Sequence, residues 1–224
     1  MLDEILVSGE KKFLQEYYEL LVSRVAHSTM SLEKDLGNVD DSSNAIRLLD
    51  NMKAFKKLLE VLSFHGELSL ELITMIADMI NESSMFISRG YRKIGKFLAD
   101  TDIPISDSSH ILEEMENLLE KYQTEWTDMD VFEREAYFHI MFIRIHPYED
   151  GNGRCARLLL NFNLLKQGYA PVIITDDLRE FYESYIREFD VSKMARLFQI
   201  QSKREHEVIQ TLYQEYEQEN IKKL

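Results

Sequence analysis

The stretch HPYEDGNGRCAR, residues 146–157, joins two segments whose apolar residues recur at helical spacing. In the segment before it, a Phe, an Ala and an Ile stand four residues apart between positions 132 and 140, which is typical of a helix face packed on a core. Pro147 disfavours helical geometry in the residue before it, so we expect this helix to end at about His146. The sequence therefore predicts a histidine at the carboxyl end of a helix.

The segment after the stretch has the same periodicity. One helix face carries Cys155, Leu158, Leu159, Phe162 and Leu165. Gly168 is suited to the left-handed conformation that often follows a helix, so this helix should stop there. A helix that begins near Gly153 would direct its N–H groups and the positive end of its dipole toward the preceding turn. We therefore predict an anion site between two helices.

Two residues of the stretch are suited to acid–base and metal chemistry. A histidine has the side chain whose unperturbed pKa lies nearest neutrality, so His146 can accept a proton from an attacking hydroxyl group. Asp150 supplies the oxygen ligands that Mg²⁺ prefers, and Mg²⁺ commonly bridges phosphate oxygens.

The remaining polar residues of the stretch are suited to phosphate binding. Gly151, Asn152 and Gly153 form a turn in which successive backbone N–H groups can converge on an anion. Arg154 and Arg157 add two planar guanidinium groups that match phosphate oxygens. The candidate binding residues are therefore these five.

The stretch resembles the signature of the Fic (Fido) family, His-Pro-Phe-x-Asp/Glu-Gly-Asn-Gly-Arg-x-x-Arg, with Tyr148 at the position of the Phe. Residues 90–92, Gly-Tyr-Arg, resemble the step ahead of the substrate-aligning hairpin of this family. Ala136 and His139 fit the helix that leads into its motif, and we expect His139 to be a packing or hydrogen-bonding residue. The resemblance covers the chain from about residue 25 to about residue 190.

The resemblance implies a protein adenylyltransferase, which transfers AMP from ATP to a Ser, Thr or Tyr hydroxyl of a target protein and releases pyrophosphate. In this interpretation His146 deprotonates the hydroxyl group and Asp150 holds Mg²⁺ against the α- and β-phosphates. Residues 151–153 cradle the phosphates through backbone N–H groups, while Arg154 and Arg157 neutralise the β/γ end.

A second motif precedes the first. Residues 29–34, Thr-Met-Ser-Leu-Glu-Lys, resemble the inhibitory pattern Ser/Thr-x-x-x-Glu-Gly/Asn of the family, with Lys34 at the last position. Thr29 and Glu33 are one helical turn apart, so we expect them on one face of an inhibitory helix at about 24–36. The resemblance implies that Glu33 pairs with Arg157 where the γ-phosphate of ATP would bind, which would make the protein autoinhibited.

Other functions remain open at this point. Glu33 could orient a water molecule that removes AMP from a modified protein, and a phosphocholine-transferring branch of the family is compatible with the loop. Gly153 argues against the Doc-like kinases, which have a lysine there. A non-catalytic ATP-binding module is a further alternative, although the intact His146 argues against it.

Composition bounds the class of protein. A chain of 224 residues with 45% hydrophobic residues can form one sizeable core, and a net charge of −14 argues against nucleic acid as a partner. The single cysteine, Cys155, excludes an internal disulfide bond and is expected to be buried, and no Cys or His spacing indicates zinc. No signal peptide or membrane span is evident, so we expect a cytoplasmic protein without membrane contact; a homo-oligomer is left open.

The expected architecture is all-α, a Fic-like helical domain with a small β-hairpin flap at about 91–105. In the family this flap adds a strand to the target peptide. Helices are predicted at 13–25, 45–64, 70–80 and 111–122. We expect residues 1–60 to form N-terminal helices on the same core, 61–190 the Fic core with its active-site loop at 146–157, and 191–224 a C-terminal helical extension. The tail from about Arg204 is predicted to be a surface helix.

Overall fold

The computed structural model describes residues 11–33, 41–85, 87–93 and 103–221, and these residues form helices without any strand. The all-α prediction is confirmed. The expected flap at about 91–105 falls largely on residues 94–102, which lie outside the described residues. The elements are α2 Lys11–Ser31, α3 Asp41–Ser63, α4 Leu70–Ile80, α5 Ile111–Thr124, α6 Val131–Ile145, α7 Asn152–Lys166, the 3-10 turn η2 Asp176–Leu178, α8 Arg179–Glu188 and α9 Val191–Ile221.

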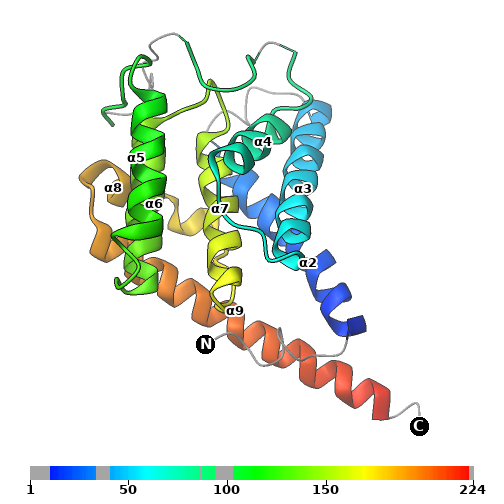
Figure 1. Ribbon diagram of the computed structural model, residues 1–224. Helices are drawn as coiled ribbons and strands as arrows, with labels where there is room; N and C mark the ends of the chain where they lie inside the picture. Colours follow the sequence, from blue (N-terminus) through cyan, green and yellow to red (C-terminus); the bar gives the residue numbers. More distant parts are fainter. Residues whose placement is uncertain (1–10, 34–40, 86, 94–102, 222–224) are drawn as a thin grey trace.

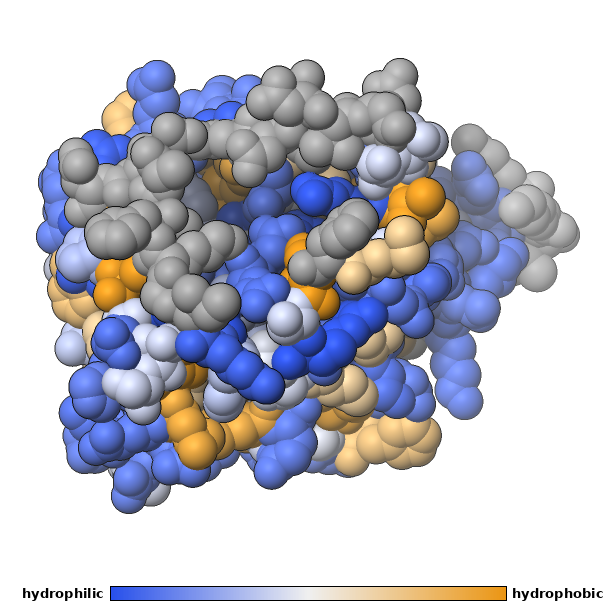
Figure 2. Space-filling model, turned by 90° about the horizontal axis from the view of Figure 1, so that it is seen from above, coloured by the Kyte–Doolittle hydropathy of each residue, from blue (hydrophilic) through white to orange (hydrophobic). Residues whose placement is uncertain are grey.

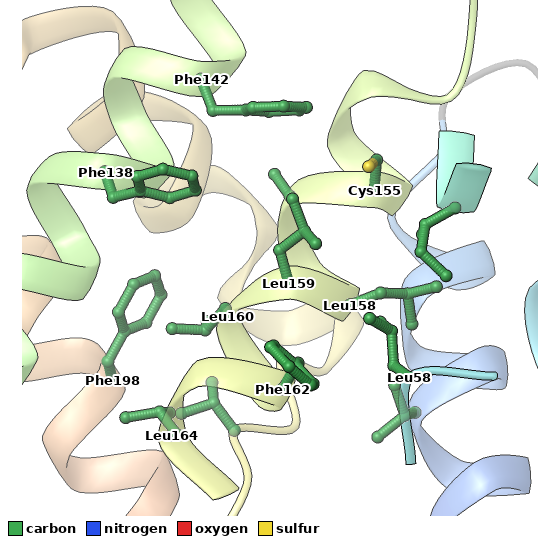
Figure 3. Packing of buried hydrophobic residues seen from close by; sticks show 14 of the residues in the cluster. Leu58, Phe138, Phe142, Cys155, Leu158, Leu159, Leu160, Phe162, Leu164 and Phe198 are labelled. Atoms are coloured by element: carbon green, nitrogen blue, oxygen red, sulfur yellow. The ribbon is translucent and has the colours of Figure 1, made fainter. Parts of the chain in front are cut away.

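Helix α7 is the centre of the fold. In Figure 1 it stands between α5 and α6 on one side and α3 and α4 on the other, with α9 crossing below. All residues of α7 except Gly153 and Lys166 are buried. Figure 3 shows its leucines and Phe162 packed between aromatic rings of α6 and α9 and Leu58 of α3. A helix that is buried nearly all round is enclosed by its neighbours, and this enclosure holds the loop at its amino end in place.

The boundaries of α6 and α7 follow from local chemistry. Asp130 caps α6 by accepting hydrogen bonds from the N–H groups of Phe132 and Glu133 at 2.9 and 3.2 Å. The helix ends at Ile145, one residue before the position predicted from Pro147, and α7 begins next to the predicted Gly153. The chain leaves α7 through Gly168, whose φ of 89° is the left-handed conformation expected there.

Helix α2 differs from the predicted inhibitory helix at 24–36. It runs from Lys11 to Ser31, and Glu33 lies beyond its end, where the Glu33 N–H bonds the carbonyl of Met30 at 3.0 Å. Lys34 lies outside the described residues. In its last turn, Ser28 Oγ donates a hydrogen bond to the carbonyl of Ile174, which connects the end of α2 to the segment after α7.

Helix α9 is more deeply packed than a surface tail. The prediction for the segment after Arg204 is wrong in its first part, because Glu205 and Ile209 are buried. Arg24 of α2 donates two hydrogen bonds to the Glu205 carboxylate, at 2.6 and 2.7 Å, and so allows this charge to be enclosed. Among the described helices, none combines the length and the apolar character needed to cross a lipid bilayer.

Candidate active site

The loop between α6 and α7 begins at His146, which has a left-handed backbone with φ 51° and ψ 58°. This conformation is uncommon outside glycine, and here it ends α6 as a left-handed C-cap. Arg92 supports this backbone: its Nε donates to the His146 carbonyl at 2.7 Å and its N–H to the Pro147 carbonyl at 2.9 Å. Residue 92 therefore anchors the start of the loop.

The middle of the loop is closed by Asn152. Its Oδ1 accepts from the N–H of Tyr148 at 2.9 Å, and its Nδ2 donates to the carbonyl of Tyr148 at 2.8 Å. The Asn152 side chain is thus engaged within the loop, and the prediction for this residue concerns its backbone N–H. The first helical bond of α7 runs from the N–H of Cys155 to the carbonyl of Gly151 at 2.8 Å, so the three N–H groups before Cys155 precede it. An anion would meet backbone here, not the amide of Asn152.

Tyr148, at the position of the family's Phe, is buried, and its hydroxyl lies 3.2 Å from Thr74 Oγ1. Burial is the main cause that raises the pKa of this phenol. The ring packs at 5.6 Å from the ring of Tyr91 and at 6.3 Å from that of Phe142. Tyrosine is tolerated in place of phenylalanine because Thr74 satisfies the added hydroxyl.

Asp150 lies at the amino end of α7 with its carboxylate oriented from two sides. Its Oδ1 accepts from the N–H of Gly151 at 2.7 Å, and its Oδ2 accepts from Arg154 Nη2 at 3.0 Å. Arg154 is itself buried and donates to the carbonyl of Ile80 and to Asn81 Oδ1, both at 3.3 Å. The guanidinium predicted to bind phosphate therefore also braces the loop carboxylate.

The residues around Asp150 are suited to Mg²⁺, and they are less suited to a metal ion that is bound by protein side chains alone. About a third of the Asp150 side chain, 34%, is exposed, which leaves carboxylate lone pairs accessible. No group of three or more His, Cys, Asp or Glu side chains suited to a metal occurs in the part of the chain that the structure describes. A single carboxylate together with phosphate oxygens and water is the ligand set that Mg²⁺ commonly takes.

A cavity of about 230 Å³ opens beside Asp150 and Arg154 and is also lined by Asp50, Asn81 and Ile87. Figure 2 looks down on the end of the molecule that carries the loop and shows hydrophilic side chains gathered around the middle of this face, with hydrophobic ones between them. The loop is therefore next to a hollow and not sealed in the core.

Arg157 and Glu33 are brought together although 124 positions separate them in the chain. Arg157 Nη2 donates to Glu33 Oε1 at 2.8 Å and to the carbonyl of Thr29 at 2.9 Å. The second carboxylate oxygen of Glu33 lies 3.7 Å from Arg154 Nε. Thr29 thus contributes a backbone oxygen. The two residues of the predicted inhibitory motif converge on Arg157, with Glu33 reaching it from the turn after α2.

Sequence reasoning missed two residues of this site. Tyr182 is the first, and its hydroxyl lies 3.4 Å from Arg157 Nη1. Asn81 was not singled out, and its Nδ2 donates to the Asp150 carbonyl at 3.0 Å. His139 is a buried hydrogen-bonding residue, as predicted, and Cys155 is buried as expected. The sequence signal that could have identified Asn81 was a polar residue directly after the apolar helix α4.

Comparison with known proteins finds a family match in the middle of the chain. Residues 60–164 match the Fic/DOC family. The chain is 38% identical over 93 residues to protein adenylyltransferase fic-1 of Caenorhabditis briggsae, which covers 41% of this chain and 17% of that protein. It is 30% identical over 122 residues to fic-1 of Caenorhabditis elegans, covering 54% of this chain and 24% of that protein. The chain thus spans a quarter or less of the length of these curated relatives.

A bacterial relative matches over more of the chain. A probable protein adenylyltransferase of Aquifex aeolicus is 25% identical over 198 residues, which is 81% of this chain and 59% of that protein.

Solved structures with the same fold include a Fic domain containing signaling protein from Bacteroides thetaiotaomicron. Its TM-score is 0.79 at 16% identity, and the match covers 92% of this chain and 91% of that one. Fic-1 of C. elegans, residues 134–508, has a TM-score of 0.70 at 20% identity, covering 94% of this chain and 68% of that one. The similarity in fold agrees with the sequence match to the family. This chain carries a Fic/DOC family domain in residues 60–164.

Proposed function

We propose that this protein is an adenylyltransferase that transfers AMP from ATP to a Ser, Thr or Tyr hydroxyl of a target protein. The observation that carries the proposal is one loop that contains His146 and Asp150 and leads into the amino end of α7, where Gly153 lies beside the Arg157 guanidinium. The adenylyltransferase names of the relatives support the reaction class.

In the proposed reaction the target hydroxyl oxygen attacks the α-phosphorus of ATP, and its proton passes to His146. A new phosphorus–oxygen bond forms as the bond to the bridging oxygen of the β-phosphate breaks, and pyrophosphate leaves. Transfers of this kind depend mainly on positioning and charge stabilisation. The N–H groups of the first turn of α7 and the guanidinium of Arg157 would hold the phosphates.

Asp150 would hold Mg²⁺, which would neutralise charge on the phosphates. Arg154 contributes by keeping the Asp150 carboxylate in place at 3.0 Å, and this role needs no direct contact with the nucleotide. Asp150 is therefore assigned to the site as the metal ligand, and Arg154 as the residue that holds Asp150.

We further propose that Glu33 inhibits the reaction. Its carboxylate takes the 2.8 Å contact with Arg157 that a terminal phosphate would need, and 22% exposure of its side chain leaves the pair largely shielded from water. Because an ion pair in such surroundings is screened little by salt, a nucleotide would have to displace it to bind productively.

The test is intact-mass analysis after incubation with ATP and Mg²⁺. Glu33→Gly should gain AMP on its own chain or transfer labelled AMP to a protein in a cell lysate, the wild type should do so far less, and Glu33→Gly combined with His146→Ala should not. Asp128→Gly, which removes an exposed carboxylate far along the chain between α5 and α6, is the matched control and should behave as the wild type.

Two outcomes would count against these proposals in different ways. If Glu33→Gly modifies neither itself nor any lysate protein, the transferase proposal fails. If the wild type and Glu33→Gly are equally active, only the inhibitory role of Glu33 fails.

A further inference from the structure

The side of Arg157 that faces away from Glu33 contacts a buried pair of residues. Tyr182 of α8 places its hydroxyl 3.4 Å from Arg157 Nη1, and the guanidinium carbon lies 5.9 Å from the centre of the tyrosine ring. The same hydroxyl lies 2.7 Å from Nε2 of His139 on α6. Tyr182 and His139 are 3% and 1% exposed, so water cannot substitute for either contact.

The direction of these hydrogen bonds follows from the groups involved. A guanidinium can only donate, so the Tyr182 oxygen accepts from Arg157. The phenol proton is then available to His139 Nε2, which lies 2.7 Å away, and we assign the Nδ1–H tautomer to His139 on this basis. Burial, followed by the charge of Arg157, lowers the pKa of His139 to about 3, so the ring is neutral and able to accept. Arg157 therefore donates to the Tyr182 oxygen, and the Tyr182 hydroxyl donates to His139.

Arg157 is also close to the loop. A Cβ built on Gly153 would stand 3.0 Å from Arg157 Nη1, so this nitrogen lies between Gly153 and the Tyr182 hydroxyl. An arginine side chain loses rotamer entropy when it is fixed, and anchoring before a ligand arrives removes that cost from binding. When Glu33 is displaced, the Thr29 carbonyl and the Tyr182 hydroxyl still hold the guanidinium.

We infer that Tyr182 and His139 are positioning residues that hold the Arg157 guanidinium against the loop, ready for the terminal phosphate of the nucleotide. This inference rests on the proposed function, in which Arg157 meets the β/γ end of ATP. Tyr182 acts through Arg157, and His139 acts through Tyr182 by fixing the direction of its hydroxyl.

The test compares the affinities for ATP and ADP, because only ATP has the γ-phosphate. The parent is Glu33→Gly with His146→Ala, which removes the competing carboxylate and prevents turnover; binding is measured by titration calorimetry with Mg²⁺. Tyr182→Phe keeps the ring but removes the hydroxyl and should lower the preference for ATP over ADP about 10-fold, the low end for one hydrogen bond to a charged group because the contact is 3.4 Å long. Tyr185→Phe, on the same helix, should leave the preference unchanged.

His139 provides a second, independent pair of variants. His139→Gln offers an amide oxygen near the place of Nε2 and should retain the preference for ATP. His139→Met, which has similar bulk without a good acceptor, should lose it to the same extent as Tyr182→Phe. This rescue by the conservative change distinguishes positioning from packing, because packing is altered in both variants.

An unchanged ratio of ATP to ADP affinity in folded Tyr182→Phe would overturn the inference, and so would an equal loss for both nucleotides. If Tyr182→Phe does not fold, the His139 variants decide, and equal ratios for Gln and Met would overturn it. If the parent binds no ATP at all, the proposed function itself fails and takes the basis of this inference with it.

Discussion

At the level of single residues, the two glycines of the loop are required for different reasons. Gly151 has φ 79°, and a Cβ there would meet Ile80 Cγ2 at 3.0 Å and Asn81 Nδ2 at 3.2 Å. Gly153 has ordinary helical geometry, and its Cβ would meet the tip of Arg157. The first glycine therefore serves the conformation of the loop, whereas the second serves the space that Arg157 occupies.

This difference predicts opposite effects of alanine at the two positions. Gly151→Ala should lower the free energy of unfolding by about 1–2 kcal/mol, because left-handed geometry and close packing both oppose a side chain. Gly153→Ala should change stability little, since alanine favours helices, but should lower AMP transfer in the Glu33→Gly background about tenfold by displacing Arg157. Urea unfolding and intact-mass analysis measure the two effects. Equal loss of stability in both variants would contradict this account.

At the level of elements, a buried carboxylate links α5, α6 and α7. Glu135 of α6 accepts hydrogen bonds from Tyr122 of α5 at 2.5 Å, from Asn163 of α7 at 2.9 Å, and from Gln167 just after α7 at 3.0 Å. Burial raises the pKa of Glu135 to about 6 from 4.5, and the hydrogen bonds oppose that shift without cancelling it. The three helices are thus tied by a group that favours its protonated form.

The raised pKa predicts the sign of a pH effect. The folded state binds more protons than the unfolded state between pH 4.5 and about 6, so the contribution of Glu135 to stability is present at low pH and is lost as pH rises through about 6. From pH 5 to 7.5 the free energy of unfolding of the wild type should fall by about 1 kcal/mol relative to that of Glu135→Gln. Urea titrations at several pH values test this, and parallel curves for the two proteins would contradict it.

At the level of the whole molecule, α2 and α9 bring together residues from the two ends of the described chain. Glu205 accepts two hydrogen bonds from Arg24 and one from the Tyr17 hydroxyl at 3.3 Å. Its side chain is 3% exposed, while that of Arg24 is 32% exposed. The helix that leads to Glu33 is therefore held along its length by α9 and, at its end, by Arg157.

Loss of the Glu205 charge should cost more than loss of a surface pair. Glu205→Gln should lower the free energy of unfolding by roughly 2 kcal/mol. This is less than the usual loss when a buried ion pair is broken, because Arg24 can still reach water. Glu19→Gln is the matched control, since Glu19 also belongs to α2 and pairs with Lys56 of α3 at 2.8 Å, but both side chains are about half exposed or more. That change should cost less than about 0.5 kcal/mol. If urea unfolding shows equal losses of stability for Glu205→Gln and Glu19→Gln, then Glu205 contributes no more than an exposed ion pair.

Local signals along the chain predicted several helices and the position of the loop. Apolar spacing predicted α4 with both of its ends, and Pro147 and Gly168 marked where α6 and α7 stop, because steric rules for such residues act on their immediate neighbours. The composition of the loop predicts phosphate handling, and this stays a prediction. The burial of Glu205 could not be predicted in this way.

Only the folded chain decides which side chains meet. The resemblance implied the pairing of Glu33 with Arg157, which the structure shows at 2.8 Å. The position of Tyr182 behind that arginine and the use of Arg154 to brace Asp150 were not predicted, because they depend on an element distant in sequence or on the direction of one long side chain. Periodicity specifies which face of a helix is buried, but it does not specify the partner across the interface. The partner depends on how all the helices pack around α7, and that arrangement exists only in three dimensions.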